Sequence, residues 1–207
     1  LGPQAHKPAK SISLRLLLTK FAKVVSSLPS RSETSLTLGI KRLDNLLRCG
    51  FPSGHLSVIH GSRAIFDLSL LAVVRSQMSD TLRGAVFVDG ANSFNPYVVS
   101  TMARTHGLDS EEILREVLVS RAFTAFQLQT LISERLELAV REHKARLVVI
   151  SDLPALYFDS EVKPSETIRL FNLAVNKLAN LASKYNLVTI ATASNQDWIR
   201  RKRVILE

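Results

Sequence analysis

Short apolar runs alternate along this chain with longer stretches in which apolar residues recur every three or four positions. Each short run is apolar almost throughout, which is typical of a strand buried on both faces of a sheet. The longer stretches have the spacing of amphipathic helices. The predicted strands are 56–60, 85–89, 116–123, 147–152 and 187–193, and the predicted helices lie near 65–79, 96–106, 125–143 and 165–184.

Strands and helices that alternate in this way predict an α/β fold, with a mostly parallel, twisted sheet and helices on both faces. Ligands of such sheets lie beyond the carboxyl ends of the strands. The loops after the strands at 56–60, 85–89 and 147–152 are therefore the first places to look for a site.

A separate segment precedes this core. Residues 12–26 carry apolar side chains at helical spacing, which predicts an N-terminal amphipathic helix, and a polar linker with Pro29 follows. We expect a tail, helix and linker over 1–35 and one core domain over 36–207.

The formal net charge of the 207 residues is +9. A basic excess of this size favours a polyanionic partner, most commonly nucleic acid, although it also serves solubility. Near the C-terminus, Trp198 precedes a run of adjacent cations that can neutralise phosphates. We expect this segment to contact DNA, with a solvated tail and a core-packed Trp198 as the alternative. The run consists of Arg200, Arg201, Lys202 and Arg203.

The chain has one cysteine, Cys49, which excludes an internal disulfide and a multi-cysteine zinc cluster. Its apolar neighbours predict a buried structural thiol. A lone thiol fits a reducing compartment, so we expect a cytoplasmic or nucleoid-associated location, nuclear in a eukaryote. No apolar run reaches the roughly 18 residues that span a bilayer, so no membrane partner is expected.

Several blocks resemble the core of archaeal RadA and its eukaryotic recombinase relatives, which have a RecA-like fold. The strongest likeness covers 84–129, where a strand ends in Asp89 and is followed by Asn-x-Phe-x-Pro, Gly-Leu-Asp and Arg-Ala-Phe. Blocks at 36–61, 145–158 and 172–194 extend it in the family's order. The helix–hairpin–helix domain that usually precedes the family's core is missing from this sequence, and the family's last strands are absent or shortened.

The resemblance implies an ATP site, and the first loop of that site departs from the family's pattern. A phosphate-binding loop reads G-x-x-x-x-G-K-[ST]: backbone N–H groups wrap the phosphates, the lysine neutralises charge and the hydroxyl binds magnesium. Here Gly61 is followed by Phe66, Asp67 and Leu68 at the last three positions. We expect the Phe66 ring to obstruct the approach of phosphate and Asp67 to repel it, by roughly 4 kcal/mol per unit charge at about 4 Å. No G-K-[ST] occurs elsewhere in the chain.

The second loop departs in the same direction. The family carries Asp-x-Glu there, whose glutamate orients the attacking water, followed by two arginines that help to hold the nucleotide. The glutamate position is Ala91, which cannot act as a base, and the arginine positions are Asn95 and Val98.

The third loop departs less clearly. The position of the family's magnesium-associated aspartate is Ser151, with Asp152 one residue later and therefore aimed differently unless a bulge intervenes. The family's phosphate-sensing Thr-Asn-Gln reads Thr192-Ala193-Ser194.

The family's frame is retained around these changes. We therefore interpret the chain as a pseudo-ATPase that uses no cofactor or metal and is not an enzyme. The retained positions are Asp89, Phe94, Pro96, Gly107, Leu108, Asp109, Arg121, Ala122 and Phe123.

Two further segments are candidate binding surfaces. In the family, the region matching 157–169 carries a DNA-contacting loop, of which Lys163 and Arg169 remain here; a plain surface loop is the alternative. RadA-type recombinases polymerise through a Phe-x-x-Ala motif before the core, and Phe21 with Val24 at the alanine position resembles it. The alternative is a helix folded onto its own domain.

The leading hypothesis is a non-catalytic recombinase paralogue that binds DNA, a recombinase, or both, in homologous recombination and repair. Its DNA would be single-stranded, and self-association is a further option. A protein-interaction subunit that pairs with an active RecA-family ATPase is the first alternative. A residual nucleotide-dependent enzyme, related to the KaiC-like branch of the superfamily, is the second.

Overall fold

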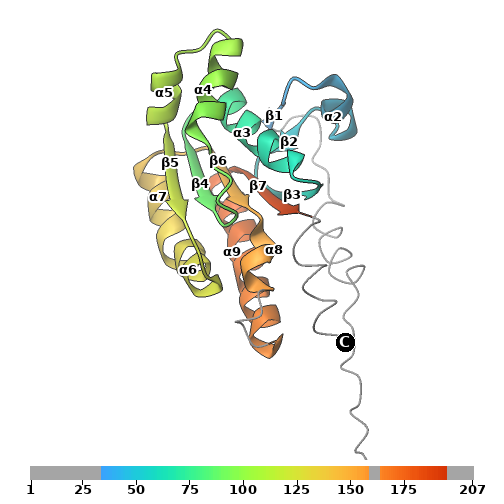
Figure 1. Ribbon diagram of the computed structural model, residues 1–207, viewed down its shortest axis with the longest axis vertical. Helices are drawn as coiled ribbons and strands as arrows, with labels where there is room; N and C mark the ends of the chain where they lie inside the picture. The colour runs from blue at the N-terminus through green and yellow to red at the C-terminus, as the bar shows by residue number, and fades with distance from the viewer. Residues whose placement is uncertain (1–33, 159–163, 195–207) are drawn as a thin grey trace, which may run out of the picture.

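The computed structural model describes residues 34–158 and 164–194 (Figure 1). The predicted N-terminal helix with Phe21 and Val24 lies outside the described residues. So do Lys163 and the segment from Trp198 to Arg203.

A five-stranded parallel sheet forms the centre of the fold. Its strand order is β3-β7-β6-β4-β5 and all neighbouring strands are parallel, so the chain crosses over between one strand and the next, and β3 and β5 are the edges within the described chain. This confirms the predicted parallel α/β architecture. The strands are β3 (His55–Gly61), β4 (Ala85–Asp89), β5 (Val117–Arg121), β6 (Leu147–Ser151) and β7 (Val188–Ser194).

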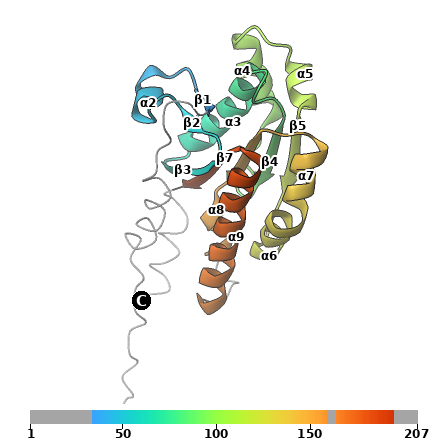
Figure 2. The same ribbon diagram turned by 180° about the vertical axis from the view of Figure 1, so that it is seen from behind.

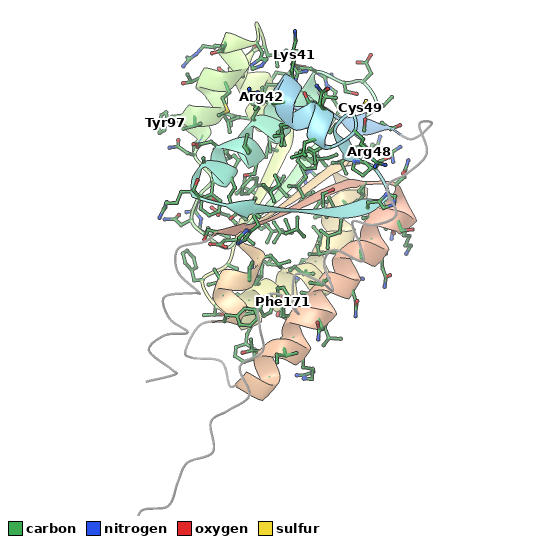
Figure 3. All side chains as sticks on the ribbon, turned by 90° about the vertical axis from the view of Figure 1, so that its right-hand side faces the viewer. Lys41, Arg42, Arg48, Cys49, Tyr97 and Phe171 are labelled. Carbon is green, nitrogen blue, oxygen red and sulfur yellow. The ribbon has the colours of Figure 1, made fainter. Side chains whose placement is uncertain are left out.

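Helices cover both faces of the sheet, as the edge-on view shows (Figure 3). Side chains alternate along each strand, so Val86 and Val88 of β4 pack in one core while Ala85 and Phe87 pack in the other. One face carries α3 (Ala64–Gln77), α4 (Pro96–Thr105) and α5 (Ser110–Arg115). The other carries α6 (Ala125–Thr130), η1 (Leu131–Arg135), α7 (Leu136–Glu142), α8 (Leu153–Tyr157) and α9 (Pro164–Tyr185).

The structure differs from the predicted elements in two respects. The helix expected over 125–143 is interrupted by the π-helical turn η1, which apolar periodicity does not reveal. Five short elements were not predicted, because each spans too few residues to establish a period. They are α5, α8, helix α2 (Lys41–Leu46) and the hairpin of β1 (Ser35–Leu36) with β2 (Phe51–Pro52).

Cys49 corrects the expectation of a buried thiol. It is exposed and lies in the turn between α2 and β2, with a φ of 89°. Leu43 and Leu47 are the α2-region residues that pack on the core, so the apolar stretch is anchored there and the turn carries Cys49 outward.

Within the described ranges, no helix is both long and apolar enough to cross a bilayer.

Candidate functional site

The loop after β3 occupies the position of the family's phosphate-binding loop. β3 ends at Gly61, and α3 begins after only two further residues. The N–H of Ile65 donates to the carbonyl of Ser62 at 3.1 Å, and the N–H of Phe66 donates to that of Arg63 at 3.0 Å. A phosphate-binding loop needs such N–H groups turned toward the ligand. Here the start of α3 engages them internally.

The residues at the start of α3 point in different directions. Phe66 is buried, with 8% exposure, so the expectation of a ring standing in the path of a phosphate is corrected: the ring anchors the helix to the interior. Asp67 is exposed on the first turn, where a carboxylate interacts favourably with the helix dipole. Leu68 packs against the core on that face. The first turn of α3 therefore presents an exposed carboxylate, at the position that the resemblance aligns with the family's lysine.

Asp89, at the end of β4, is fully buried at the centre of a hydrogen-bond network. Its Oδ1 accepts the N–H of Ser93 at 2.9 Å and the hydroxyl of Ser151 at 2.8 Å. Its Oδ2 accepts the N–H of Phe94 at 3.1 Å, and Nη2 of Arg121 at 3.1 Å. The carboxylate thus joins the ends of β4, β5 and β6 and holds the loop after β4 in place.

The network keeps Asp89 ionised. Burial alone would raise the pKa of this carboxyl group. The hydrogen bonds from the backbone of Ser93, the side chain of Ser151 and the backbone of Phe94, together with the charge of Arg121, outweigh burial and lower the pKa below its ordinary value. The charge is therefore satisfied by protein donors.

Three residues of the loop after β4, which the sequence analysis expects to stand at the family's catalytic and binding positions, have local structural contacts. Ala91 presents a methyl group, and its N–H donates to Ser151 Oγ at 3.2 Å. Asn95 caps α4, because its Oδ1 accepts the N–H groups of Tyr97 and Val98 at 3.0 and 3.3 Å. Val98 also packs against the core.

The third loop holds a second buried carboxylate. Asp152 follows the end of β6 in a left-handed conformation, with a φ of 46°. Its N–H donates to Thr192 Oγ1 at 2.8 Å, and its carboxylate accepts the N–H and the hydroxyl of Ser194 at 2.9 and 2.6 Å. Ser151 turns toward Asp89 while Asp152 turns toward β7, so the one-residue displacement sends the two side chains to different partners. Ala193 lies between the two β7 residues and is buried.

Several retained frame residues shape loops and helix ends. Pro96 occupies the first turn of α4, Gly107 has a φ of 72°, and Asp109 caps α5 by accepting the N–H of Glu111 at 2.8 Å. Phe123 is different: it is 70% exposed, so the expectation that it supports the fold is corrected.

Hydrogen bonds and an ion pair thus link the carboxyl ends of β4, β5, β6 and β7 to one another. Across the described residues, no group of three or more His, Cys, Asp or Glu side chains is arranged to hold a metal ion. The sequence predicted Asp89 as a retained position but not its partnership with Ser93 and Arg121. The sequence carried no signal for the pair, because the neighbourhood of β4 and β5 is known only from the structure.

Of the predicted DNA-contacting residues, Arg169 is described. It is exposed on α9, and its Nη2 lies 3.6 Å from Oε1 of Glu166. This ion pair is one turn along the same helix and solvent-exposed, so it restrains Arg169 only weakly.

The fold and the strand-end loops define the class of protein. The family model described as Rad51 matches residues 30–198, so the chain belongs to the Rad51 family, a class of DNA repair and recombination proteins.

Two relatives illustrate the match. The chain is 31% identical over 173 residues to the DNA repair and recombination protein RadB of Thermococcus sibiricus, covering 83% of this chain and 72% of RadB. It is 27% identical over 168 residues to the DNA repair protein RAD51 of Mycosarcoma maydis, covering 76% of this chain. The matched region is 49% of that relative, so the chain spans about half of its length.

Proposed function

We propose that this chain is a nucleotide-independent member of the Rad51 family that assists recombination and repair by binding DNA, a recombinase, or both. The observation that carries the proposal is the start of α3. Its first turn engages the N–H groups of Ile65 and Phe66 and exposes the carboxylate of Asp67. A magnesium–triphosphate complex would meet repulsion where it needs an ammonium group and free amide donors.

The second and third loops support the same proposal. Asp89 and Asp152, the carboxylates at the ends of β4 and β6, each accept several hydrogen bonds from protein groups. Either carboxylate would have to give up some of these hydrogen bonds to coordinate a magnesium ion or to orient a water molecule. The role that remains is binding, with Trp198 and the run Arg200–Arg203 as the proposed contact with single-stranded DNA.

A titration with magnesium–ATP tests the nucleotide-independent part. We expect the unfolding temperature to stay constant up to millimolar ATP, whereas binding at 100 times Kd would stabilise the fold by about 2.7 kcal/mol. The variant Asp67→Lys sharpens the test. If charge alone prevented binding, this variant would regain it; we expect no gain, because the helical turn still engages the amides. Saturable stabilisation of the unaltered chain would contradict the proposal.

A second candidate function, a protein-interaction subunit, is favoured by the β5 edge of the sheet. β5 has one neighbouring strand among the described residues, β4, and Val119 on it is exposed. Phe123 and Phe126 next to it are 70% and 54% exposed. An open strand edge flanked by apolar side chains is a common acceptor for an added peptide strand. The adjacent π-helical turn η1 is an element often found at functional sites.

Binding to a purified Rad51-family recombinase distinguishes the two candidates. If the β5 edge is the contact, the double variant Phe123→Ser, Phe126→Ser should lose the recombinase while DNA binding is unchanged. Leu173→Ser on α9, where Leu173 is 47% exposed, is the matched control for removing an exposed apolar side chain. Equal loss in the control, or no loss in the double variant, would exclude this edge.

A further inference from the structure

The helix α2 and the turn that follows it carry three cations that the strand-end loops do not use. Lys41, Arg42 and Arg48 are exposed, and none has a carboxylate oxygen within 4.0 Å among the described residues. Figure 3 shows all three around α2, on the opposite side of the sheet from Phe171.

The surrounding sequence does not neutralise this charge. Asp44 is the one acidic residue within 34–66. Its Oδ1 accepts the N–H of Leu38 at 2.8 Å, so it fixes the entry into α2. The cations therefore remain available to a partner from outside the chain.

Stability does not account for these residues. Lys41 and Arg42 stand in the first turn of α2, where the helix dipole disfavours positive charge. Arg48 has a φ of 52°, an uncommon conformation for a residue with a side chain. Leu46 is 78% exposed and adds nothing to the core. Residues that do not stabilise their own element are expected where a surface serves binding.

Helical spacing places Arg42 and Leu46 four residues apart, and therefore side by side on one face of α2. We name Lys41, Arg42, Leu46 and Arg48 the α2 surface. It contains a lysine and no aromatic residue, whereas the cores of protein interfaces are poor in lysine and rich in aromatic side chains, although arginine is common in both settings. This composition fits a phosphate backbone better than an acidic protein segment.

We propose that the α2 surface binds single-stranded DNA, with the three cations on phosphates and Leu46 against the apolar face of an unpaired base. This inference rests on the DNA-binding part of the proposed function and adds a contact separate from the Arg200–Arg203 run. Charge complementarity carries it, together with membership of a family of DNA repair proteins.

Fluorescence anisotropy with a labelled oligothymidylate of about 30 nucleotides, at two salt concentrations, measures the contact directly. We expect the triple variant Lys41→Ala, Arg42→Ala, Arg48→Ala to weaken binding about tenfold or more at low salt, and to reduce the log–log salt slope by about 2 for three lost phosphate contacts. Leu46→Ala should weaken binding and leave that slope unchanged.

The chain offers a matched control and a built-in reporter. Arg104, Arg141 and Lys144 are exposed and have no ion pair among the described residues, so replacing all three with alanine removes the same charge elsewhere. Cys49 is the only cysteine and lies exposed beside Arg48. Bound DNA should slow its reaction with maleimide, also in a variant whose Arg200–Arg203 run is replaced by alanine.

The outcomes separate this inference from the proposed function. Equal losses in the α2 and control variants, or a Cys49 reaction rate that DNA does not change, would overturn the inference while DNA binding by the chain stands. If DNA binding is lost in the Arg200–Arg203 variant and unchanged in the α2 variant, the inference is likewise overturned and the proposed function stands. An unaltered chain that binds no oligonucleotide at low salt would overturn both. If the α2 surface binds an acidic peptide and no DNA, the inference is overturned as well.

Discussion

Two aspartates lie near the carboxyl end of the sheet in opposite circumstances, one on the first turn of α3 and one at the end of β4. Asp67 is exposed on the first turn of α3, whereas Asp89 is fully buried and accepts hydrogen bonds from residues on three sides. The first stands where the family pattern has a lysine for phosphate, and the second stands at a retained position. The difference teaches that the surroundings decide what a carboxylate does at this edge of the sheet: Asp89 holds strand ends and a loop together, whereas Asp67 is exposed to solvent.

The largest expected effect separates these two aspartates. Asp89→Ala should destabilise the fold by about 3–5 kcal/mol, because it leaves buried donors and the Arg121 charge without their partner. Asp67→Ala removes the same carboxylate from the surface and should change stability by no more than about 0.5 kcal/mol. Urea unfolding of both variants measures the contrast. If both variants lose a similar free energy of unfolding, Asp67 stabilises the start of α3 as strongly as Asp89 stabilises its network.

Acid titration tests the buried carboxylate of Asp89 directly. The pKa of Asp89 is lowered in the folded chain, so its contribution to stability is present above the unfolded-state pKa of about 4 and is lost as the pH falls through the folded pKa. We therefore expect the free energy of unfolding to fall less steeply below about pH 4 in Asp89→Asn than in the unaltered chain. A slope unaffected by Asp89→Asn would mean that the network does not favour the ionised form.

A network far from the loops provides a comparison for that titration. Glu137 on α7 accepts hydrogen bonds from Lys177, Lys184 and Tyr185 of α9, which lower its pKa to about 2. Its stabilising contribution is thus present above about pH 4.5 and is lost as the pH falls toward 2. Because the two carboxylates share no partner, the effects of Glu137→Gln and Asp89→Asn on the slope should add.

The sequence was sufficient for the sheet, its direction and the long helices. Runs such as 85–89 and 147–152 are apolar on both faces and leave little alternative to buried parallel strands. The exposure of Cys49 could not be predicted, because the pattern of apolar residues around a short helix does not show which of them contact the core. The interruption at η1 was also beyond it, since one added residue in a helical turn barely disturbs the apolar spacing.

The candidate site was predictable in its residue types and not in its geometry. The sequence identified Phe66, Asp67 and Ala91 as departures from the family pattern. It did not indicate that Phe66 is buried, or that the N–H groups of Ile65 and Phe66 are engaged by the carbonyls of Ser62 and Arg63. Both depend on the space between α3 and the sheet, which tertiary packing decides. The roles of Ser93 and Ser151 likewise required knowledge of which strands are neighbours.

The smallest expected effect concerns how the two helices begin. α4 starts with Asn95, whose side chain accepts two backbone N–H groups, while α3 starts at Arg63 with no side-chain cap. Asn95→Ala should therefore cost about 1 kcal/mol, and Arg63→Ala should be close to neutral. Thermal unfolding with Asn95→Asp as a rescue variant measures this, because aspartate accepts the same bonds. If Asn95→Ala is neutral as well, the residue at the family's arginine position has no structural role, and its replacement would need an explanation in binding.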